Sequence, residues 1–327
     1  MRLRRSDPSA PGFGRRRRGT SFSYTDTHGA PLTDPAAIAR IKELVIPPAW
    51  TDVWISPDPR GHIQAAGTDA AGRRQYLYHD VWRRKRDEEK FDHVLEVAER
   101  LPRLRKRLAV DLRGDRLTRE RVLAAVAKLI DLGLFRVGND EYAKGEEATY
   151  GVATLLPEHL RIRRDGMEFR YPAKGGIERV CSVTDDEVCR VLTQLRRRRD
   201  KTRLFQFREG GTWREVRSDD VNAYLKAASG IEMSTKDFRT WHATVLAATL
   251  LAEHDPRGAP LTRRRRTAAR VMREVAEELG NTPTVAKASY VDPRVVDLYH
   301  DRVTVALPRR FSRTGVESAV LRLLREA

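Results

Sequence analysis

The sequence has few of the residues that mark an extracellular, metal-binding or membrane protein. Its 327 residues include two cysteines, Cys181 and Cys189, which are too few for a disulfide scaffold and spaced unlike a metal motif. No apolar run approaches a membrane span, and the first residues lack the apolar segment of a secretory signal. We find no Walker loop and no cluster of carboxylates and histidines with metal spacing, so neither ATP nor a metal is implied. These absences predict a protein of the reduced cytoplasm.

Positive charge, by contrast, is abundant. Lysine and arginine number 63 against 46 aspartates and glutamates, a formal net charge of +17. Such a surplus repels itself, so a polyanionic partner is expected. DNA, RNA or an anionic membrane surface would serve, the membrane least well because no basic amphipathic anchor stands apart from the body. The hydrophobic content of 40% is enough for a core, and the length allows one large domain or two ordinary ones.

The pattern of the chain changes along its length and predicts an α+β protein. Residues 1–18 are mostly arginine, proline, glycine and serine, so we expect a disordered basic tail. Residues 19–88 read as strands and turns and predict a small antiparallel β-sheet domain. The charged stretch 83–90 marks the predicted boundary. From residue 89 to 327 the hydrophobic period is 3.6, which predicts a larger, mostly α-helical domain.

Local signals within the helical domain define its expected elements. Ser234, with Asp237 three residues later, predicts the start of a helix, and Gly280 predicts the end of another. Asp165-Gly166 predicts a β-hairpin over 162–171, to which residues 204–207 would add a third strand. The expected helices cover residues 91–110, 118–132, 185–195, 219–228, 235–252 and 267–279.

Five short passages carry the functional signal. In chain order they read GRRQYLY at 72–78, LFRVGND at 134–140, YPAKGG at 171–176, STKDFRT at 234–240 and NTPTVAKASY at 281–290. Together they resemble the DNA-binding and catalytic motifs of type IB DNA topoisomerases, in particular the poxvirus-like bacterial group. The resemblance covers residues 47–299. Several motifs in a fixed order are far more specific than any one of them.

The resemblance implies a role for each matching residue. Tyr290 matches the nucleophile that attacks the scissile phosphodiester and holds the DNA 3′ end as a phosphotyrosine. Arg136 and Arg239 match the arginines that bind the non-bridging phosphate oxygens, and Lys174 matches the general acid that protonates the leaving 5′ oxygen. Asn281 stands where poxvirus members carry histidine. An amide can donate a hydrogen bond to phosphate but cannot do acid–base work.

These residue types suit the chemistry. Phosphoryl transfer develops negative charge on oxygen atoms, and fixed donors in a site that excludes water stabilise that charge. The guanidinium fork matches two phosphate oxygens and does not lose its proton. The cationic surroundings would help Tyr290 lose its proton during attack and would lower the pKa of Lys174. The ester energy stays in the protein–DNA link, so neither ATP nor a metal is required.

The resemblance also implies how DNA is bound. Gln75, Tyr76 and Tyr78 match a DNA-contacting strand, and Tyr142, six residues after Arg136, matches a further contact. The implied activity is relaxation of supercoiled duplex DNA by transient cleavage of one strand, rotation and religation. We expect a monomer that closes as a clamp around the duplex, associated with the nucleoid. The arginine runs 196–199 and 263–266 are expected to face solvent or the DNA backbone.

Other interpretations of the same residues remain open. Taken singly, each proposed catalytic side chain would be an ordinary packing, turn or surface residue. The tyrosines that could act as nucleophile in place of Tyr290 are Tyr142, Tyr224 and Tyr299, but none has its spacing after Asn281.

Two other functions fit part of the pattern. A tyrosine recombinase shares the fold and chemistry, yet typically has histidine three residues before the second arginine, where this chain has Lys236, and begins with a helical domain. A non-catalytic DNA-binding protein would explain the charge alone.

Overall fold

The computed structural model describes residues 1–133, 135–145, 147–198, 202–254 and 256–327. Leu134, which opens the predicted motif at 134–140, and Arg199, which ends one predicted arginine run, lie outside the described residues. The chain divides into two compact units, Met1–Asp92 and His93–Ala327. We call them unit 1 and unit 2 and describe each by itself.

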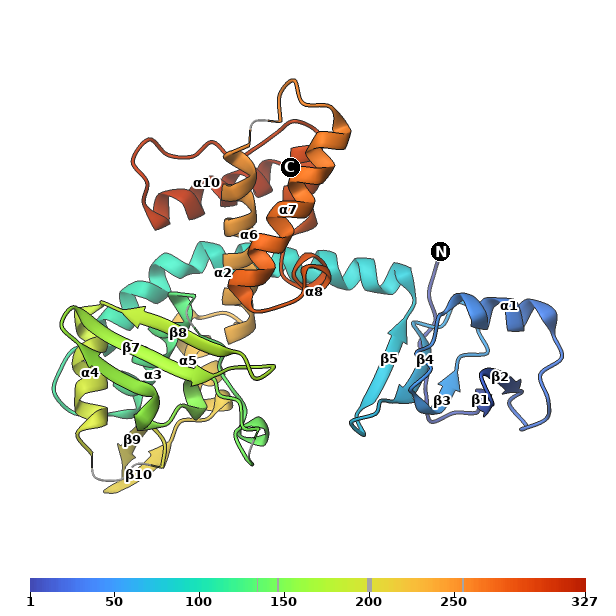
Figure 1. Cartoon of the computed structure of the whole chain (residues 1–327), viewed down its shortest axis with the longest axis horizontal. Helices are drawn as coiled ribbons and strands as arrows, with labels where there is room; N and C mark the ends of the chain where they lie inside the picture. The colour runs from blue at the N-terminus through green and yellow to red at the C-terminus, as the bar shows by residue number, and fades with distance from the viewer. Residues whose placement is uncertain (134, 146, 199–201, 255) are drawn as a thin grey trace. The chain divides into compact units, whose positions relative to one another are not determined.

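Unit 1 is an antiparallel five-stranded sheet with the strand order β2-β1-β3-β4-β5, together with the helix α1 and the start of a second helix at Asp80 (Figure 1). Ile41 of α1 packs with Ile55 and Ala65 of the sheet to form a small core. The helix was not predicted, although Asp34 caps it and Pro35 occupies its first turn, a typical helix start. The elements are β1 (Phe13–Arg18), β2 (Ser21–Thr25), α1 (Pro35–Glu43), β3 (Thr51–Ile55), β4 (Ile63–Thr68) and β5 (Arg74–Tyr78).

The predicted disordered tail over 1–18 is wrong, because residues 13–18 form strand β1. The strand pairs with β2 and β3. The Arg15 guanidinium donates hydrogen bonds of 2.8–2.9 Å to the carbonyl oxygens of Ile46, Pro47 and Trp50 and lies over the Phe22 ring. The prediction counted only apolar side chains. Ladder hydrogen bonds and a multiply bonded arginine also offset the entropy of ordering.

The predicted boundary at 83–90 lies inside a continuous helix, α2 (Asp80–Asp111). This stretch is charged, but lysine, arginine and glutamate are good helix formers. Its charges also pair at helical spacing, as Arg86 with Glu89 at 3.0 Å and Lys90 with Asp87 at 3.4 Å. High charge therefore indicated an exposed helical surface and not a break in regular structure.

Unit 2 is mostly helical, as the 3.6-residue period predicted, and the chain is an α+β protein. The predicted hairpin forms as β6 (Leu160–Arg163) and β7 (Gly166–Pro172). Its third strand is β8 (Glu178–Val183), and not residues 204–207 as predicted. Strand β9 (Gln206–Glu209) instead pairs with β10 (Thr212–Glu215), because Gly210-Gly211 closes a separate tight hairpin between them.

The helices of unit 2 enclose one core. Residues 122–127 of α3 are fully buried, and Phe238 and Trp241 bury α6 against the same cluster. No helix in the described ranges is long and apolar enough to cross a bilayer. Besides α2, the helices are α3 (Arg119–Asp131), α4 (Asp186–Arg196), α5 (Ser218–Ser229), α6 (Thr235–Ala252), α7 (Leu261–Leu279), α8 (Pro283–Ser289), α9 (Pro293–His300) and α10 (Arg313–Glu326), with the short 3-10 helices η1 (Asp140–Tyr142), η2 (Val152–Thr154) and η3 (Pro157–His159).

Candidate active site

The C-terminus of helix α7 is the point where four of the five predicted catalytic residues meet. Gly280 adopts the left-handed conformation (φ 60°, ψ 50°) and ends the helix as predicted. Arg136 Nη2 donates to the carbonyl oxygens of Leu279 at 3.0 Å and Gly280 at 2.8 Å. Arg239 Nη2 donates to Leu279 O at 2.9 Å. The last carbonyls of a helix carry partial negative charge, so they attract both guanidiniums.

Arg136 is positioned by its neighbour in the chain. Phe135 is 2% exposed, and its ring meets Phe169 edge-on at 4.9 Å and stacks on Tyr171 at 5.8 Å. The carbonyl oxygen of Arg136 accepts a hydrogen bond from Val152 N at 2.8 Å. An anchored aromatic ring and a paired backbone thus leave the Arg136 side chain little freedom.

Arg239 lies in the second turn of α6. The predicted helix start is confirmed, because Asp237 Oδ2 accepts from both the backbone nitrogen (2.7 Å) and the hydroxyl (3.0 Å) of Ser234. Phe238 and Trp241 on the same helix are buried at 0% and 1% exposure. The cap and the buried rings therefore set the direction in which Arg239 leaves the helix.

Asn281 follows the α7 cap and faces Arg136. Its Oδ1 accepts from Arg136 Nη2 at 3.0 Å, which directs its Nδ2 elsewhere. That Nδ2 is buried and has no hydrogen-bond partner among the residues that the structure describes. A buried unpaired amide donor is costly unless a ligand oxygen completes it.

Tyr290 lies just past the end of α8, which starts with the Thr282 cap. The guanidinium carbon of Arg239 is 5.3 Å from the centre of its ring. The Thr244 hydroxyl on α6 donates to Tyr290 O at 3.3 Å and accepts from Asp292 N at 3.1 Å. Helix α6 thereby holds both Arg239 and the backbone of the tyrosine.

The electrostatics of this group are those of an anion site. Neither Arg136 nor Arg239 forms an ion pair with a carboxylate within the described chain. Burial lowers the pKa of Arg239 to about 10, and the charge of Arg136 adds to the shift. Burial likewise lowers the pKa of Arg136. A phosphate would relieve this repulsion.

Arg179 is a further cation of this group and was not predicted from the sequence. It lies on β8 and contributes to lowering the pKa of both Arg136 and Arg239. Its Nη1 donates to Glu278 O at 3.4 Å, on the last turn of α7. No feature of its local sequence distinguishes it from the many other arginines.

The structure does not bring Lys174 into contact with the other four residues. It lies exposed on the turn between β7 and β8, where Gly176 N donates to Ala173 O at 3.0 Å. Gly175 and Gly176 both have positive φ, 85° and 73°, which glycine adopts without strain. The lysine therefore lies on a glycine turn, with no hydrogen bond or ion pair to the described part of the chain.

The predicted DNA-contacting residues are largely exposed. Tyr76 and Tyr78 on β5 are 42% and 40% exposed, with their rings stacked at 6.1 Å. Gln75 is partly buried and donates to Asp69 at 2.9 Å. Tyr142, in unit 2 on η1, is 53% exposed. These positions leave the three tyrosines accessible to a ligand.

Two of the alternative nucleophiles are already occupied or buried. Tyr224 donates its hydroxyl hydrogen to Asp111 at 2.7 Å, and its pKa is raised, chiefly by burial. Tyr299 is 2% exposed. Tyr290 has the Arg239 guanidinium over its ring, whereas neither of these two tyrosines has such a contact in the described chain.

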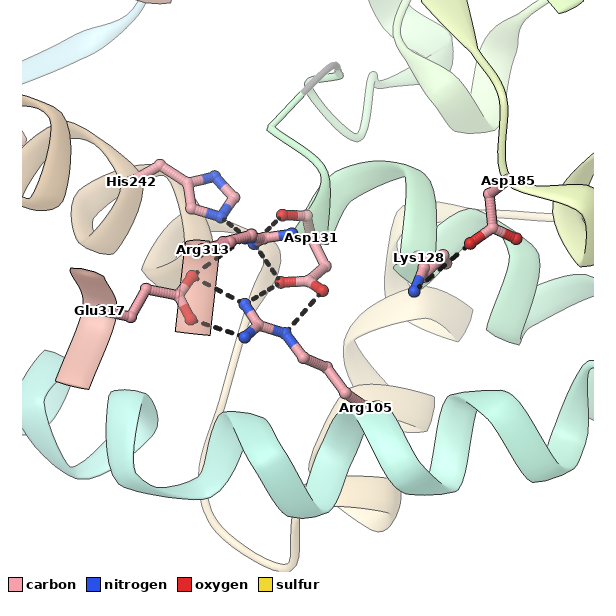
Figure 2. Close-up of polar contacts among 7 residues, drawn as sticks. All are labelled: Arg105, Lys128, Asp131, Asp185, His242, Arg313 and Glu317. Carbon is pink, nitrogen blue, oxygen red and sulfur yellow. Dashed lines mark hydrogen bonds and ion pairs between the residues drawn. The ribbon is translucent and has the colours of Figure 1, made fainter. Parts of the chain in front are cut away.

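A second pair of arginines in unit 2 is neutralised by carboxylates (Figure 2). Arg105 on α2 binds Asp131 at 2.9 Å and Glu317 at 2.6 Å, and Arg313 on α10 binds the same two carboxylates. His242, one turn beyond Arg239, accepts from Arg313 at 2.9 Å, since arginine can only donate. We call Arg105, Asp131, His242, Arg313 and Glu317 the ionic cluster. It ties the end of α3, shortly before Arg136, to α6.

Burial governs the protonation states of the ionic cluster. Burial alone would raise the pKa of Asp131, but hydrogen bonds from Arg105 and the charges of Arg313 and Arg105 outweigh it, so the pKa is lowered. Burial and the Arg313 charge lower the pKa of His242 to about 4. The cluster therefore holds a charged aspartate and a neutral histidine at neutral pH.

Comparison with known proteins gives consistent matches over most of the chain. Residues 79–305 match the family model for the catalytic core of eukaryotic DNA topoisomerase I. Residues 21–69 match the model for the N-terminal domain of bacterial DNA topoisomerase IB. The chain is 29% identical over 300 residues to DNA topoisomerase 1B of Acanthamoeba polyphaga mimivirus, covering 89% of this chain and 88% of that protein.

Poxvirus proteins match at lower identity. DNA topoisomerase I of Monkeypox virus and DNA topoisomerase 1B of Vaccinia virus (strain Copenhagen) are each 21% identical over 273 residues. Both matches cover 82% of this chain and 84% of the viral protein.

Proposed function

The chain belongs to the type IB DNA topoisomerases, and from that premise we propose that it relaxes supercoiled DNA by cutting and rejoining one strand through Tyr290. One observation carries the proposal. Arg136, Arg239, Asn281 and Tyr290, from separate stretches of unit 2, gather at the end of α7, and no carboxylate of the described residues pairs with them. That arrangement suits a backbone phosphate next to a phenol.

In the proposed reaction the Tyr290 oxygen attacks the scissile phosphorus. A bond from phosphorus to the tyrosine oxygen forms, the bond to the 5′ oxygen breaks, and the phenol loses its proton. The DNA 3′ end is then held as a phosphotyrosine, and the 5′ oxygen leaves as a hydroxyl. Religation is the same exchange in reverse, so the ester energy is conserved and no ATP is consumed.

The fixed donors would stabilise the charge that develops during the exchange. Each guanidinium donates from Nη2 to the α7 carbonyls, and Arg239 also has a side-chain hydrogen bond with Tyr290. The N–H groups of Arg136 other than those on Nη2 have no partner within the described residues. These groups can bind the non-bridging oxygens in a partly buried site, where charge-assisted hydrogen bonds are strong. The unpaired Nδ2 of Asn281 can supply one further donor.

Lys174 is proposed as the acid that protonates the leaving 5′ oxygen. Its exposed glycine turn implies that bound DNA brings it to the phosphate, since it contacts none of the other four residues in the described chain. Arriving beside several arginines would lower the pKa of its ammonium and favour proton donation.

Unit 1 is proposed to bind DNA through Gln75, Tyr76 and Tyr78, and unit 2 through Tyr142. We further propose that residues 19–88 act as the DNA-binding part and 89–327 as the catalytic part. A monomer would close as a clamp around the duplex, and the enzyme would work at the nucleoid. A crosslink between the two parts that left DNA loading unaffected would contradict the clamp.

The decisive experiment compares wild type with Tyr290→Phe on supercoiled plasmid without ATP or magnesium. Wild type should relax the plasmid and form a covalent adduct that survives denaturing gels. Tyr290→Phe should bind DNA but form no adduct, because the attacking oxygen is missing, whereas Tyr299→Phe, the matched loss of a buried phenol oxygen, should retain activity. An adduct that persists in Tyr290→Phe would overturn the assignment.

A further inference from the structure

The register of the unit 1 sheet places two arginines of β1 on the same face as the exposed tyrosines of β5. Residues paired across antiparallel strands share a face. Tyr76 pairs with Ala66, Ala66 with Trp54, and Trp54 with Gly14. Residues two apart on a strand also share a face. Arg16 and Arg18 therefore lie on the face of Tyr76 and Tyr78.

The composition of this face suits a polyanion. Its paired positions on β1 and β2 match Arg16 with Ser23 and Arg18 with Ser21. No paired position on this face is an aspartate or glutamate. The opposite face holds the apolar core under α1. Arginines and hydroxyl groups are the side chains that contact phosphate oxygens.

The four arginines of β1 divide by face. Arg15 donates hydrogen bonds to three backbone carbonyls and so stabilises the fold. Arg16 and Arg18 are exposed, and neither has an ion pair or side-chain hydrogen bond within the described chain. Arg17 is also exposed, but the alternation of the strand places it on the opposite face. Unpaired cations on a face whose paired positions hold no carboxylate indicate an external anion.

The distances across the sheet fit one duplex. β1 is separated from β5 by β3 and β4 (Figure 1), which is about 14 Å at the usual strand spacing. Arg16 and Arg18 are about 7 Å apart along an extended strand. A duplex that contacts the β5 tyrosines would then present backbone phosphates within reach of β1. Strand β1 lies outside both stretches that match family models, 21–69 and 79–305.

We propose that Arg16 and Arg18 extend the DNA-binding face of unit 1 as a phosphate clamp on the β1–β2 hairpin. The inference rests on the proposed function in one respect, that the duplex lies on the β5 face. The clamp contributes affinity without sequence preference, because it meets phosphates and not base edges.

The test uses the full chain with both arginines replaced, Arg16→Ser/Arg18→Ser. Each lost phosphate contact lowers the slope of log K against log salt by about 0.9, so the slope should fall by about 2. Affinity for a 30-base-pair duplex in about 0.1 M salt should fall roughly 10- to 100-fold, and equally for two unrelated sequences. The control Arg17→Ser/Lys42→Ser removes the same charge from β1 and α1 but from the other face. It should change the slope by much less than one.

The outcomes separate this proposal from the proposed function. If the two double variants weaken binding equally, only net charge matters. The proposed phosphate clamp of Arg16 and Arg18 is then wrong, whatever the plasmid assay shows. If the clamp variant alone loses affinity but still forms the covalent adduct at saturating DNA, both proposals stand. If wild type binds DNA with a steeper salt slope than Arg16→Ser/Arg18→Ser but never forms an adduct, the proposed reaction fails and the phosphate clamp remains. Thermal unfolding of each variant confirms that the sheet is intact.

Discussion

Unit 2 holds two pairs of half-buried arginines, and their surroundings differ. Arg105 and Arg313 are matched by Asp131 and Glu317, so the ionic cluster is complete in the free protein. Arg136 and Arg239 are held by carbonyl oxygens at the end of α7 and by Asn281 and Tyr290, with no carboxylate partner in the described chain. The first pair stabilises the fold, and the second stores repulsion that an anion would relieve. The counter-ion, and not burial, distinguishes the arginines of the ionic cluster from those proposed to bind phosphate.

The largest effect on folding is expected from Asp131→Asn. It leaves Arg105 and Arg313 buried with one carboxylate, and breaking such a pair typically costs about 3–5 kcal/mol in the free energy of unfolding. Urea denaturation measures the loss. The control is Glu99→Gln, which breaks the exposed pair of Glu99 with Arg325 between the same helices, α2 and α10. The control should lower the free energy of unfolding by about 1 kcal/mol or less. Equal losses in the two variants would mean that the ionic cluster stabilises the fold no more than an exposed ion pair does.

The largest effect on catalysis is expected from Arg239→Ala. Removing one fixed donor to a developing charge slows the reaction by about 10²–10³-fold. The free energy of unfolding should change by only about 1 kcal/mol, since one hydrogen bond is lost while repulsion from Arg136 is relieved. The rate of adduct formation at saturating DNA measures the effect on the reaction, and urea denaturation measures the free energy of unfolding.

Two further variants sharpen this prediction. Arg239→Lys should restore little activity, because an ammonium lacks the guanidinium fork. Arg273→Ala, on the exposed surface of α7, should form the adduct at the wild-type rate. If Arg239→Ala formed the adduct at the wild-type rate, Arg239 would have no role in the reaction.

A smaller effect on the free energy of unfolding is expected from pH, because the ionic cluster contains His242. The pKa of His242 is about 4 when folded against about 6.5 when unfolded, so the unfolded chain binds the extra proton between those values. Stability should therefore fall as the pH drops from 6.5 to 4, by about 2–3 kcal/mol from this group. Asp131, whose pKa is lowered below its ordinary value, contributes only at lower pH.

His242→Gln tests the pH effect, because its amide oxygen can still accept from Arg313 without titrating. Urea denaturation at pH 7 and pH 4.5 should give a smaller difference for the variant than for wild type. An unchanged difference would mean that His242 does not control the acid response of the cluster.

Local elements were predicted well where the signal is short. The Ser234 cap, the hairpin at 162–171 and the Gly280 helix end were all confirmed, because each depends on contacts within a few residues. Strand β1 was missed because its order comes from ladder hydrogen bonds with β2 and β3 and from the hydrogen bonds of Arg15, and not from apolar side chains. The helix over 83–90 was missed because charge was taken for a linker signal.

The candidate site shows the same division. Arg136, Arg239, Asn281 and Tyr290 were named from ordered motifs, and they meet in space. Their assigned roles and that of Lys174 stay predictions. Arg179 and the ionic cluster were not predicted, since each partner is ordinary in its local sequence and acquires meaning only from a neighbour far away in the chain.

The amino-acid sequence by itself determined the α+β class, the family and the residue types offered for phosphate chemistry. These follow from periodicity, composition and motif order, which are local or additive properties. Folding settles which arginines face carbonyls, which face carboxylates and which face solvent. The physical reason is that the energy of a charge depends on its surroundings within a few ångströms, and folding supplies those surroundings from distant parts of the chain.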